Sequence, residues 1–139
     1  MPGPNGRQMG MTLSGRAPEP TVSVMLRGEI WLVDLEPARG SEVNKQRPAV
    51  VVSNDRANAT ATRLGQGVIT VVPVTSNVTR IHPFQVLLPA VSTGLAVDSK
   101  ALCEQIRSIV VERLRGPIGR VPPAEMAQLD DAIRLHLEL

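Results

Sequence analysis

Arg47 and Glu42 are the residues of this chain whose types and spacing most directly suggest chemistry. Glu42 lies five residues before Arg47, in a loop that begins Gly40-Ser41, and Pro48 follows the arginine. A guanidinium stays charged at any working pH and presents a planar set of donors to phosphate oxygens. The proline restricts Arg47 to extended conformations, and a nearby Glu42 carboxylate could accept a proton as a general base. The pair therefore predicts a phosphate site, although a lone arginine at a strand edge is more often solvated or ion-paired.

A hydroxyl and two side-chain amides could complete such a site. Thr75 follows the apolar run 71–74, and Asn77 lies in the same turn. The hydroxyl could stabilise charge that develops on a phosphoryl oxygen, or it could satisfy backbone groups of the turn. Asn77 could contact a base or a phosphate. Gln105 is expected in the middle of a strand, where a side-chain amide either meets a backbone group or faces a cleft.

The elements that must position these residues are short β-rich runs separated by turn residues. The sequence predicts strands over 27–35, 48–53, 67–74, 84–88 and 100–110. A last element, 123–138, spaces its apolar residues three and four apart, as on one face of an amphipathic helix. These residues are Met126, Leu129, Ile133 and Leu137. Successive strands and one terminal helix predict a mainly β fold with a C-terminal helix, in the form of a small, strongly curved SH3-like barrel.

Prolines and turn residues mark the segments between these elements. Residues 54–66 could hold a short helical turn. Pro73 interrupts a strong strand pattern and therefore predicts an edge position or a bulge. The segment 116–123 is predicted to be a connector, and Pro123 can begin the helix because its missing N–H would have no partner there.

Length and composition favour one domain. The chain has 139 residues, which suits a single hydrophobic core. Residues 1–24 mix Pro and Gly without apolar periodicity, so we expect a flexible N-terminal extension, or an over-called start, before a domain over 25–139. No apolar run approaches the roughly 20 residues that span a bilayer, and the extension lacks the apolar segment of a secretory signal peptide.

The single cysteine and the two histidines limit the chemistry further. Cys103 cannot form an intrachain disulfide, which fits a reducing cytosol and a cytoplasmic protein. It lies in an expected strand, so a buried, inert thiol is favoured over a nucleophile. His82 and His136 are far apart in the sequence and build neither a zinc site with the cysteine nor a two-histidine acid–base pair. We therefore expect no metal and no cofactor.

Charge and aromatic content limit how this chain could hold a nucleic acid. The formal net charge is only +2, but arginines gather in predicted loops and at strand ends, away from an acidic C-terminal segment. Trp31 and Phe84 both stand in apolar strand contexts, so a platform that stacks bases is not expected. Any RNA would be held mainly by hydrogen bonds, arginines and backbone groups.

Short motifs occur through residues 26–139 at a characteristic spacing. They are Gly28-Glu29-Ile30-Trp31 with Asp34, Gly40-Ser41-Glu42, Arg47-Pro48, Val50-Val51-Val52-Ser53-Asn54-Asp55, Val74-Thr75-Ser76, Pro83-Phe84 and Glu104-Gln105-Ile106-Arg107. In these motifs and their spacing the chain resembles the MazF/PemK-type toxins of bacterial toxin–antitoxin pairs. The Arg-Pro and Val-Thr pairs are specific when both fall at these strand ends, whereas either alone is weak.

This resemblance implies an SH3-like barrel that pairs as a homodimer and cleaves single-stranded RNA without a metal, leaving a 2′,3′-cyclic phosphate and a free 5′-hydroxyl. It implies that Arg47 and Thr75 are the catalytic arginine and threonine, and that Glu42 matches a loop glutamate whose role varies among members. The expected RNA contacts are Ser41, Lys45, Asn77 and Gln105. A cognate antitoxin would block the RNA groove with an acidic, extended tail.

Two other functions are compatible with a small barrel. The CcdB-type toxins share the barrel and jam DNA gyrase without chemistry, but they depend on a tryptophan near the C-terminus, and this chain ends His136-Leu137-Glu138-Leu139. A generic SH3-like module that binds a peptide usually presents an aromatic groove, which two aromatic residues can hardly provide.

Overall fold

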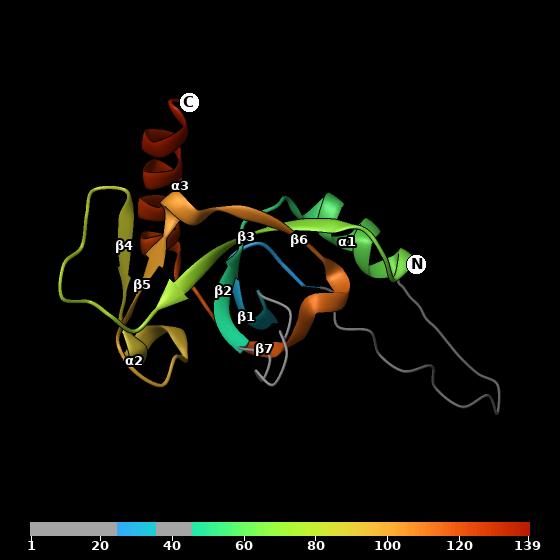
Figure 1. The fold of residues 1–139 in the computed structure, drawn as a ribbon, viewed down its shortest axis with the longest axis horizontal. Coiled ribbons are helices and arrows are strands. Elements are labelled where there is room, and N and C mark those ends of the chain that lie inside the picture. The colour runs from blue at the N-terminus through green and yellow to red at the C-terminus, as the bar shows by residue number, and fades with distance from the viewer. Residues whose placement is uncertain (1–24, 36–45) are drawn as a thin grey trace, which may run out of the picture.

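The computed structural model describes residues 25–35 and 46–139. The elements follow in the order β1 (Glu29–Asp34), β2 (Gln46–Val51), α1 (Asp55–Leu64), β3 (Val68–Thr75), β4 (Gln85–Leu88), α2 (Ala90–Thr93), β5 (Ser99–Leu102), η1 (Cys103–Gln105), β6 (Arg107–Val110), η2 (Val111–Arg113), β7 (Leu114–Arg120) and α3 (Pro123–Leu137). Figure 1 shows β3 crossing the molecule, with β4, β5 and α3 around one of its ends and α1 near the other. The predicted extension, 1–24, lies outside the described residues. No described helix is long and apolar enough to cross a membrane.

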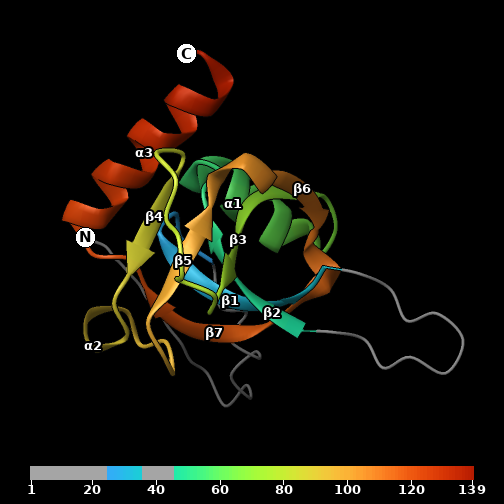
Figure 2. The same ribbon diagram turned by 60° about the vertical axis from the view of Figure 1, so that its left-hand side comes forward.

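All strand pairs are antiparallel, and β3 takes part in three of them. The strands follow the order β4-β5-β3-β2-β1-β7, and β6 pairs with β3 beside this path. Figure 2 shows β1, β2 and β7 curving together along one side of the molecule. Within the described residues β6 and β7 are joined by η2 rather than by a backbone ladder. The mainly β fold with a C-terminal helix is confirmed, whereas the sheet is not a closed barrel.

The central strands bury both of their faces, each in a separate core. In β3, Val72 belongs to one core and its neighbour Val71 to the other. Successive residues of a strand point to opposite faces, so a strand covered on both sides is apolar throughout. Leu129 of α3 belongs to the first core, and Ala61 of α1 belongs to the second. The two helices therefore cover opposite faces of the strands that carry the candidate site.

The segment predicted to hold a short helical turn forms the ten-residue helix α1. Asn54 caps its start by accepting a hydrogen bond from the backbone N–H of Ala57 at 2.8 Å. Gly65 ends it at φ 65°, a left-handed conformation that glycine adopts without strain. Only Asn58 and Ala61 of this helix are buried. The sequence of α1 therefore shows almost no apolar periodicity. The capping residues Asn54 and Gly65 are the sequence signal that indicates a full helix.

The strand predicted over 100–110 is two strands, β5 and β6, separated by one turn of 3-10 helix. Both pair with β3, β6 as far as Val71 and β5 from Val74 onward. Pro73, which has no N–H to donate, lies in the interval between these two ladders. The predicted edge position for Pro73 is wrong, because β3 is an interior strand and the proline falls where β3 changes partner.

The segment predicted to be a connector, 116–123, is mostly part of strand β7. Gly116 lies opposite Leu32 of β1, and Pro117 lies opposite Trp31. β7 is the last strand of the sheet, and an edge strand tolerates proline because the missing donor faces away from the ladder. Helix α3 begins at Pro123, as predicted.

Gly119 and Gly116 offer a matched test of how β7 packs. A Cβ atom on Gly119 would overlap the carbonyl oxygen of Thr93 at the end of α2, whereas one on Gly116 would meet nothing within 4 Å. We expect Gly119→Ala to lower the free energy of unfolding by about 1–3 kcal/mol, as overpacking does, and Gly116→Ala to change it by less than about 0.5 kcal/mol. Urea unfolding measures both, and equal effects would contradict the close approach of β7 to α2.

Candidate functional site

The register between β2 and β3 brings Arg47 and Thr75 together. Ala49 pairs with Pro73, and the pairing continues in step through Val51. The β2–β3 pairing ends at Ala49 and Pro73. Arg47 lies two residues before this last pair on β2, and Thr75 lies two residues after it on β3. Residues that are 28 positions apart in the sequence thereby come to the same end of two neighbouring strands.

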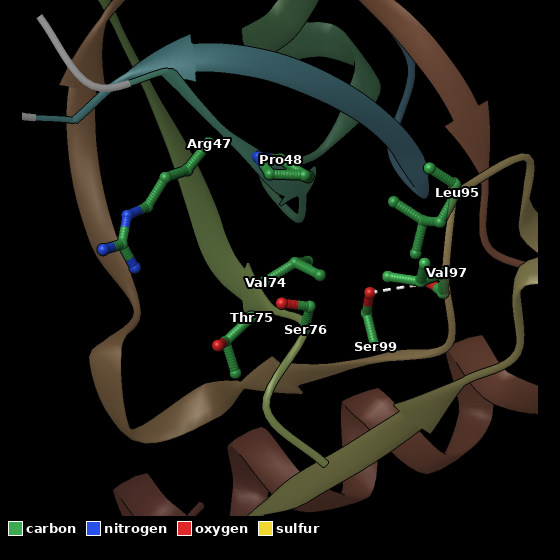
Figure 3. Close-up of a pocket in the computed structure, with 9 residues that line it drawn as sticks. Arg47, Pro48, Val74, Thr75, Ser76, Leu95, Val97 and Ser99 are labelled. Carbon is green, nitrogen blue, oxygen red and sulfur yellow. Dashed lines mark hydrogen bonds between the residues drawn. The ribbon is translucent and has the colours of Figure 1, made fainter.

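An open pocket of about 340 Å³ confirms that both residues border the same space. Its lining residues are Arg47, Pro48, Val74, Thr75, Ser76, Leu95, Ala96, Val97 and Ser99. Figure 3 shows the Arg47 side chain on one side of this pocket, with Thr75 and Ser76 at the end of β3 and Leu95, Val97 and Ser99 across from the arginine. The pocket therefore combines a cation and hydroxyls with an apolar wall.

The hydroxyl of Thr75 serves the turn and remains available to a ligand. Its Oγ1 accepts a hydrogen bond from the backbone N–H of Asn77 at 3.2 Å. A hydroxyl that accepts one bond still has its own hydrogen to donate. The Asn77 Oδ1 in turn accepts from the N–H of Thr79 at 3.2 Å, which leaves the Asn77 amide hydrogens free to donate. The structural and the functional interpretation of Thr75 are thus compatible.

Arg47 is exposed at the edge of the pocket, where its side chain extends away from Leu95 and Ser99 (Figure 3), and it forms no ion pair within the described part of the chain. Among residues 25–35 and 46–139, no carboxylate lies within 4.0 Å of its guanidinium. A charged fork of donors in an open pocket suits an anionic ligand such as a phosphate.

The strand beside Arg47 is fixed by three further arginines. In the register of β1 and β2, Val33 lies opposite Arg47. One residue later, the buried carboxylate of Asp34 forms an ion pair with Arg115. The backbone carbonyl of Asp34 accepts a hydrogen bond from Arg113 and that of Leu35 accepts one from Arg107, each at 3.1 Å. These contacts hold the end of β1 in place beside the strand that carries Arg47.

The other predicted site residues have different outcomes. Ser41, Glu42 and Lys45 lie outside the described residues, so their roles stay predictions. Asn77 is exposed in the turn after Thr75. The prediction that Gln105 lies in the middle of a strand is wrong. Gln105 ends the 3-10 helix η1, is exposed, and does not line the pocket. The cause is the change of strand partner described above, which breaks the expected strand at this position.

Several features of the site gave no signal in the sequence. The apolar wall comes from Leu95, Ala96 and Val97, between α2 and β5. Lys100 pairs with Thr75 from β5 and is buried. The apolar wall and Lys100 belong to one segment, residues 95–100. The pairing of β5 with β3 brings this segment next to Thr75.

The two histidines, which are far apart in the sequence, lie near the same aromatic ring in the structure. The rings of His82 and Phe84 stack with centroids 5.2 Å apart, and the His136 ring of α3 lies 6.4 Å from Phe84. Phe84 precedes β4 and is half-buried rather than part of an apolar strand. This ring cluster does not line the Arg47–Thr75 pocket.

Cys103 is buried in η1 and poorly suited to act as a nucleophile. Burial raises the pKa of its thiol to about 12, and the charges of Glu104 and Asp130 add to the rise. A protonated thiol is a weak nucleophile and a weak metal ligand. The described residues also contain no group of three or more His, Cys, Asp or Glu side chains that could hold a metal ion.

Comparisons with known proteins agree on one family. The family described as PemK-like, MazF-like toxin of type II toxin–antitoxin system matches residues 26–137. Endoribonuclease MazF9 of Mycobacterium tuberculosis is 74% identical over 116 residues, which cover 84% of this chain and 98% of that protein. Endoribonuclease EndoA of Bacillus subtilis is 32% identical over 117 residues, which cover 84% and 97%.

Solved structures of the same kind share the fold. The crystal structure of MazF from Deinococcus radiodurans matches with a TM-score of 0.66 and 26% identity, covering 84% of this chain and 99% of that one. A crystal structure of MazE–MazF from the same organism matches with a TM-score of 0.67 and 25% identity, covering 84% and 98%.

The raised pKa of Cys103 predicts a thiol that does not react with alkylating reagents in the folded protein. At about pH 8 the group is protonated in the folded protein because its pKa lies far above that pH. We expect iodoacetamide to leave the native protein unmodified and to alkylate it fully in guanidinium chloride, as mass spectrometry would show. Native alkylation as fast as that of the unfolded chain would contradict the burial of Cys103.

Proposed function

The chain belongs to the PemK-like, MazF-like toxins of type II toxin–antitoxin systems, and from this we propose that it is an endoribonuclease that cleaves single-stranded RNA at the Arg47–Thr75 pocket. The observation that carries the proposal is that the guanidinium of Arg47 and the hydroxyl of Thr75 line one open pocket at the adjoining ends of β2 and β3. Family membership favours this function over the gyrase-poison and peptide-module alternatives.

The proposed reaction is an attack of the ribose 2′-hydroxyl on the adjacent phosphorus. A bond forms between O2′ and phosphorus while the bond from phosphorus to the 5′-oxygen breaks. The 2′-hydroxyl proton passes to a base, and the leaving 5′-oxygen gains a proton. The products are a 2′,3′-cyclic phosphate and a 5′-hydroxyl end. The phosphoryl oxygens carry extra negative charge in the transition state, so donors that are already in place lower the barrier.

Arg47 and Thr75 are the donors that this reaction requires. The guanidinium of Arg47 can pair with two phosphoryl oxygens at once, and the Thr75 hydroxyl can donate to one of them from the neighbouring strand. Glu42 remains the proposed base, since a carboxylate can accept the 2′-hydroxyl proton. Arginine is a reluctant proton donor because its guanidinium stays protonated at any working pH. The mechanism therefore names no residue as the general acid that protonates the leaving 5′-oxygen.

No metal is included in this mechanism, because a guanidinium and a hydroxyl can stabilise the charge that a metal would otherwise neutralise. The remaining RNA contacts are proposed from the loop residues Ser41 and Lys45 and from Asn77, whose amide hydrogens are free beside Thr75. Gln105 has weaker support, since it is exposed outside the pocket.

The proposal extends to partners. A solved relative is a MazE–MazF complex, and another is an endoribonuclease with its cognate antitoxin. We propose a cognate antitoxin for this chain as well, with an acidic tail that occupies the RNA groove where Arg47 would otherwise meet phosphate. A cytoplasmic homodimer is proposed from the family resemblance.

The direct test is cleavage of a long single-stranded RNA in EDTA, with both new ends mapped. We expect discrete cuts with cyclic-phosphate and 5′-hydroxyl ends. Arg47→Ala should lower kcat by about 10²- to 10³-fold, the usual loss when a preorganised transition-state donor is removed. The matched control is Arg56→Ala, which removes an exposed arginine of α1.

Each outcome of this test decides a part of the proposal. RNA that stays intact across several substrates would refute the endoribonuclease. Cleavage that stops in EDTA would refute the metal-free mechanism. Normal cleavage by a folded Arg47→Ala protein would reassign Arg47 to structure.

A further inference from the structure

Lys100 lies directly beside Thr75 in the sheet, on the side away from Arg47. The register of β3 and β5 pairs Thr75 with Lys100, and the strand order β5-β3-β2 places Lys100 and Arg47 on opposite sides of β3. Paired residues of antiparallel strands share one face of the sheet, so Lys100 and Thr75 lie on the same face. Ser99, next to Lys100, lines the pocket itself.

The side chain of Lys100 is buried without a counter-ion in the described part of the chain. The residue is only 9% exposed, and its ammonium donates a hydrogen bond to the backbone carbonyl of Arg80. The ion pairs formed by the described residues are Arg27–Asp130, Arg115–Asp34 and Arg134–Asp131. A buried ammonium that lacks a carboxylate partner costs free energy. The hydrogen bond to the Arg80 carbonyl is the contact that offsets part of this cost, and an apolar side chain at this position could not form it.

Arg80 belongs to the β3–β4 loop, residues 76–84, which begins at the candidate site. The first turn of this loop depends on two side-chain acceptors. Thr75 Oγ1 accepts from the N–H of Asn77, and Asn77 Oδ1 accepts from the N–H of Thr79, each at 3.2 Å. These bonds determine where the Thr75 hydroxyl and the Asn77 amide point.

The loop is attached to the sheet at its far end and near its middle. At the far end, the N–H of His82 donates to the Gln85 side chain at 3.1 Å, and the N–H of Gln85 donates to the carbonyl of His82 at 2.9 Å. Between the two ends, the bond from Lys100 to Arg80 is the side-chain hydrogen bond that ties the described loop to the sheet. This bond therefore restrains the stretch that follows Thr79, which is continuous with the first turn.

We propose that Lys100 is a positioning residue for RNA cleavage, which holds the β3–β4 loop so that Thr75 and Asn77 stay aimed at the phosphate beside Arg47. This inference rests on the proposed function. Lys100 acts through Thr75 and Asn77 rather than on the reacting atoms. A misplacement of about 1 Å at a reacting group can lower a rate by about 10²-fold, so a small movement of this turn is enough to impair cleavage.

The test compares Lys100→Met with Lys100→Arg. Methionine keeps an unbranched apolar stem and removes the ammonium, whereas arginine keeps a cation that can reach Arg80. We expect Lys100→Met to lower kcat by about 10- to 100-fold. The Kd for an RNA with a 2′-deoxy sugar at the cleaved position should change by less than about threefold, because Lys100 does not itself bind RNA. Lys100→Arg should recover most of the rate, and the control Arg56→Met should behave like the wild type.

Amide hydrogen exchange measures whether the hydrogen bonds of the first turn of the β3–β4 loop stay formed. The N–H groups of Asn77 and Thr79 are protected by the two bonds of the first turn. We expect both to exchange at least about tenfold faster in Lys100→Met and at the wild-type rate in Lys100→Arg. Should Lys100→Met not fold, Lys100→Gln, which is neutral but polar, replaces it with the same expected results.

The outcomes separate this inference from the proposed function. A wild-type protein that cleaves no RNA would refute the function. A wild-type protein that cleaves RNA, beside a Lys100→Met protein with normal kcat, would refute only the role of Lys100. A lower kcat with unchanged exchange at Asn77 and Thr79 would also overturn the positioning role.

Discussion

The register of β2 against β3 is the constraint on which the rest of this structure depends. Val50 pairs with Val72 and Val51 with Val71, and all four side chains are fully buried. A slip of one residue would send each side chain of one strand to the opposite face. Because both faces are covered by separate cores, neither core could accept such a slip. The packing of apolar residues in the middle of the two strands therefore fixes the polar residues at their ends.

The same strand shows how a small fold collects a site from distant parts of the chain. β3 pairs with β6 near its start and with β5 near its end. The change of partner brings β5 to Thr75, and with β5 come Lys100 and the segment that walls the pocket. On the other side, β1 is secured by arginines at the end that adjoins Arg47. Strands β2 and β3 thus support Arg47 and Thr75, and the turn after Thr75 is held by side-chain hydrogen bonds.

The sequence predicted those parts of the fold that depend on local pattern. Arg47 and Thr75 were recognisable because each stands at the end of an apolar run, and helix α3 was recognisable from its spacing and its prolines. Strand β7 was not, because its glycines and prolines argue for a connector, and only pairing with β1 makes it a strand. Lys100 was missed for a related reason: a lysine in a predicted strand gives no sign of burial until its cross-strand neighbours are known.

The central claim is that Arg47 and Thr75 act as one unit across two strands, and a double-mutant cycle on kcat tests it most directly. Arg47→Lys keeps the charge but loses the planar fork, and Thr75→Val removes the hydroxyl while keeping the shape of the side chain. If both donors stabilise the same phosphoryl group, the double variant should lose less than the sum of the two single losses, with a coupling free energy of about 0.5–3 kcal/mol. Losses that simply add, within about 0.3–0.5 kcal/mol, would show that the two residues act independently and would contradict the account.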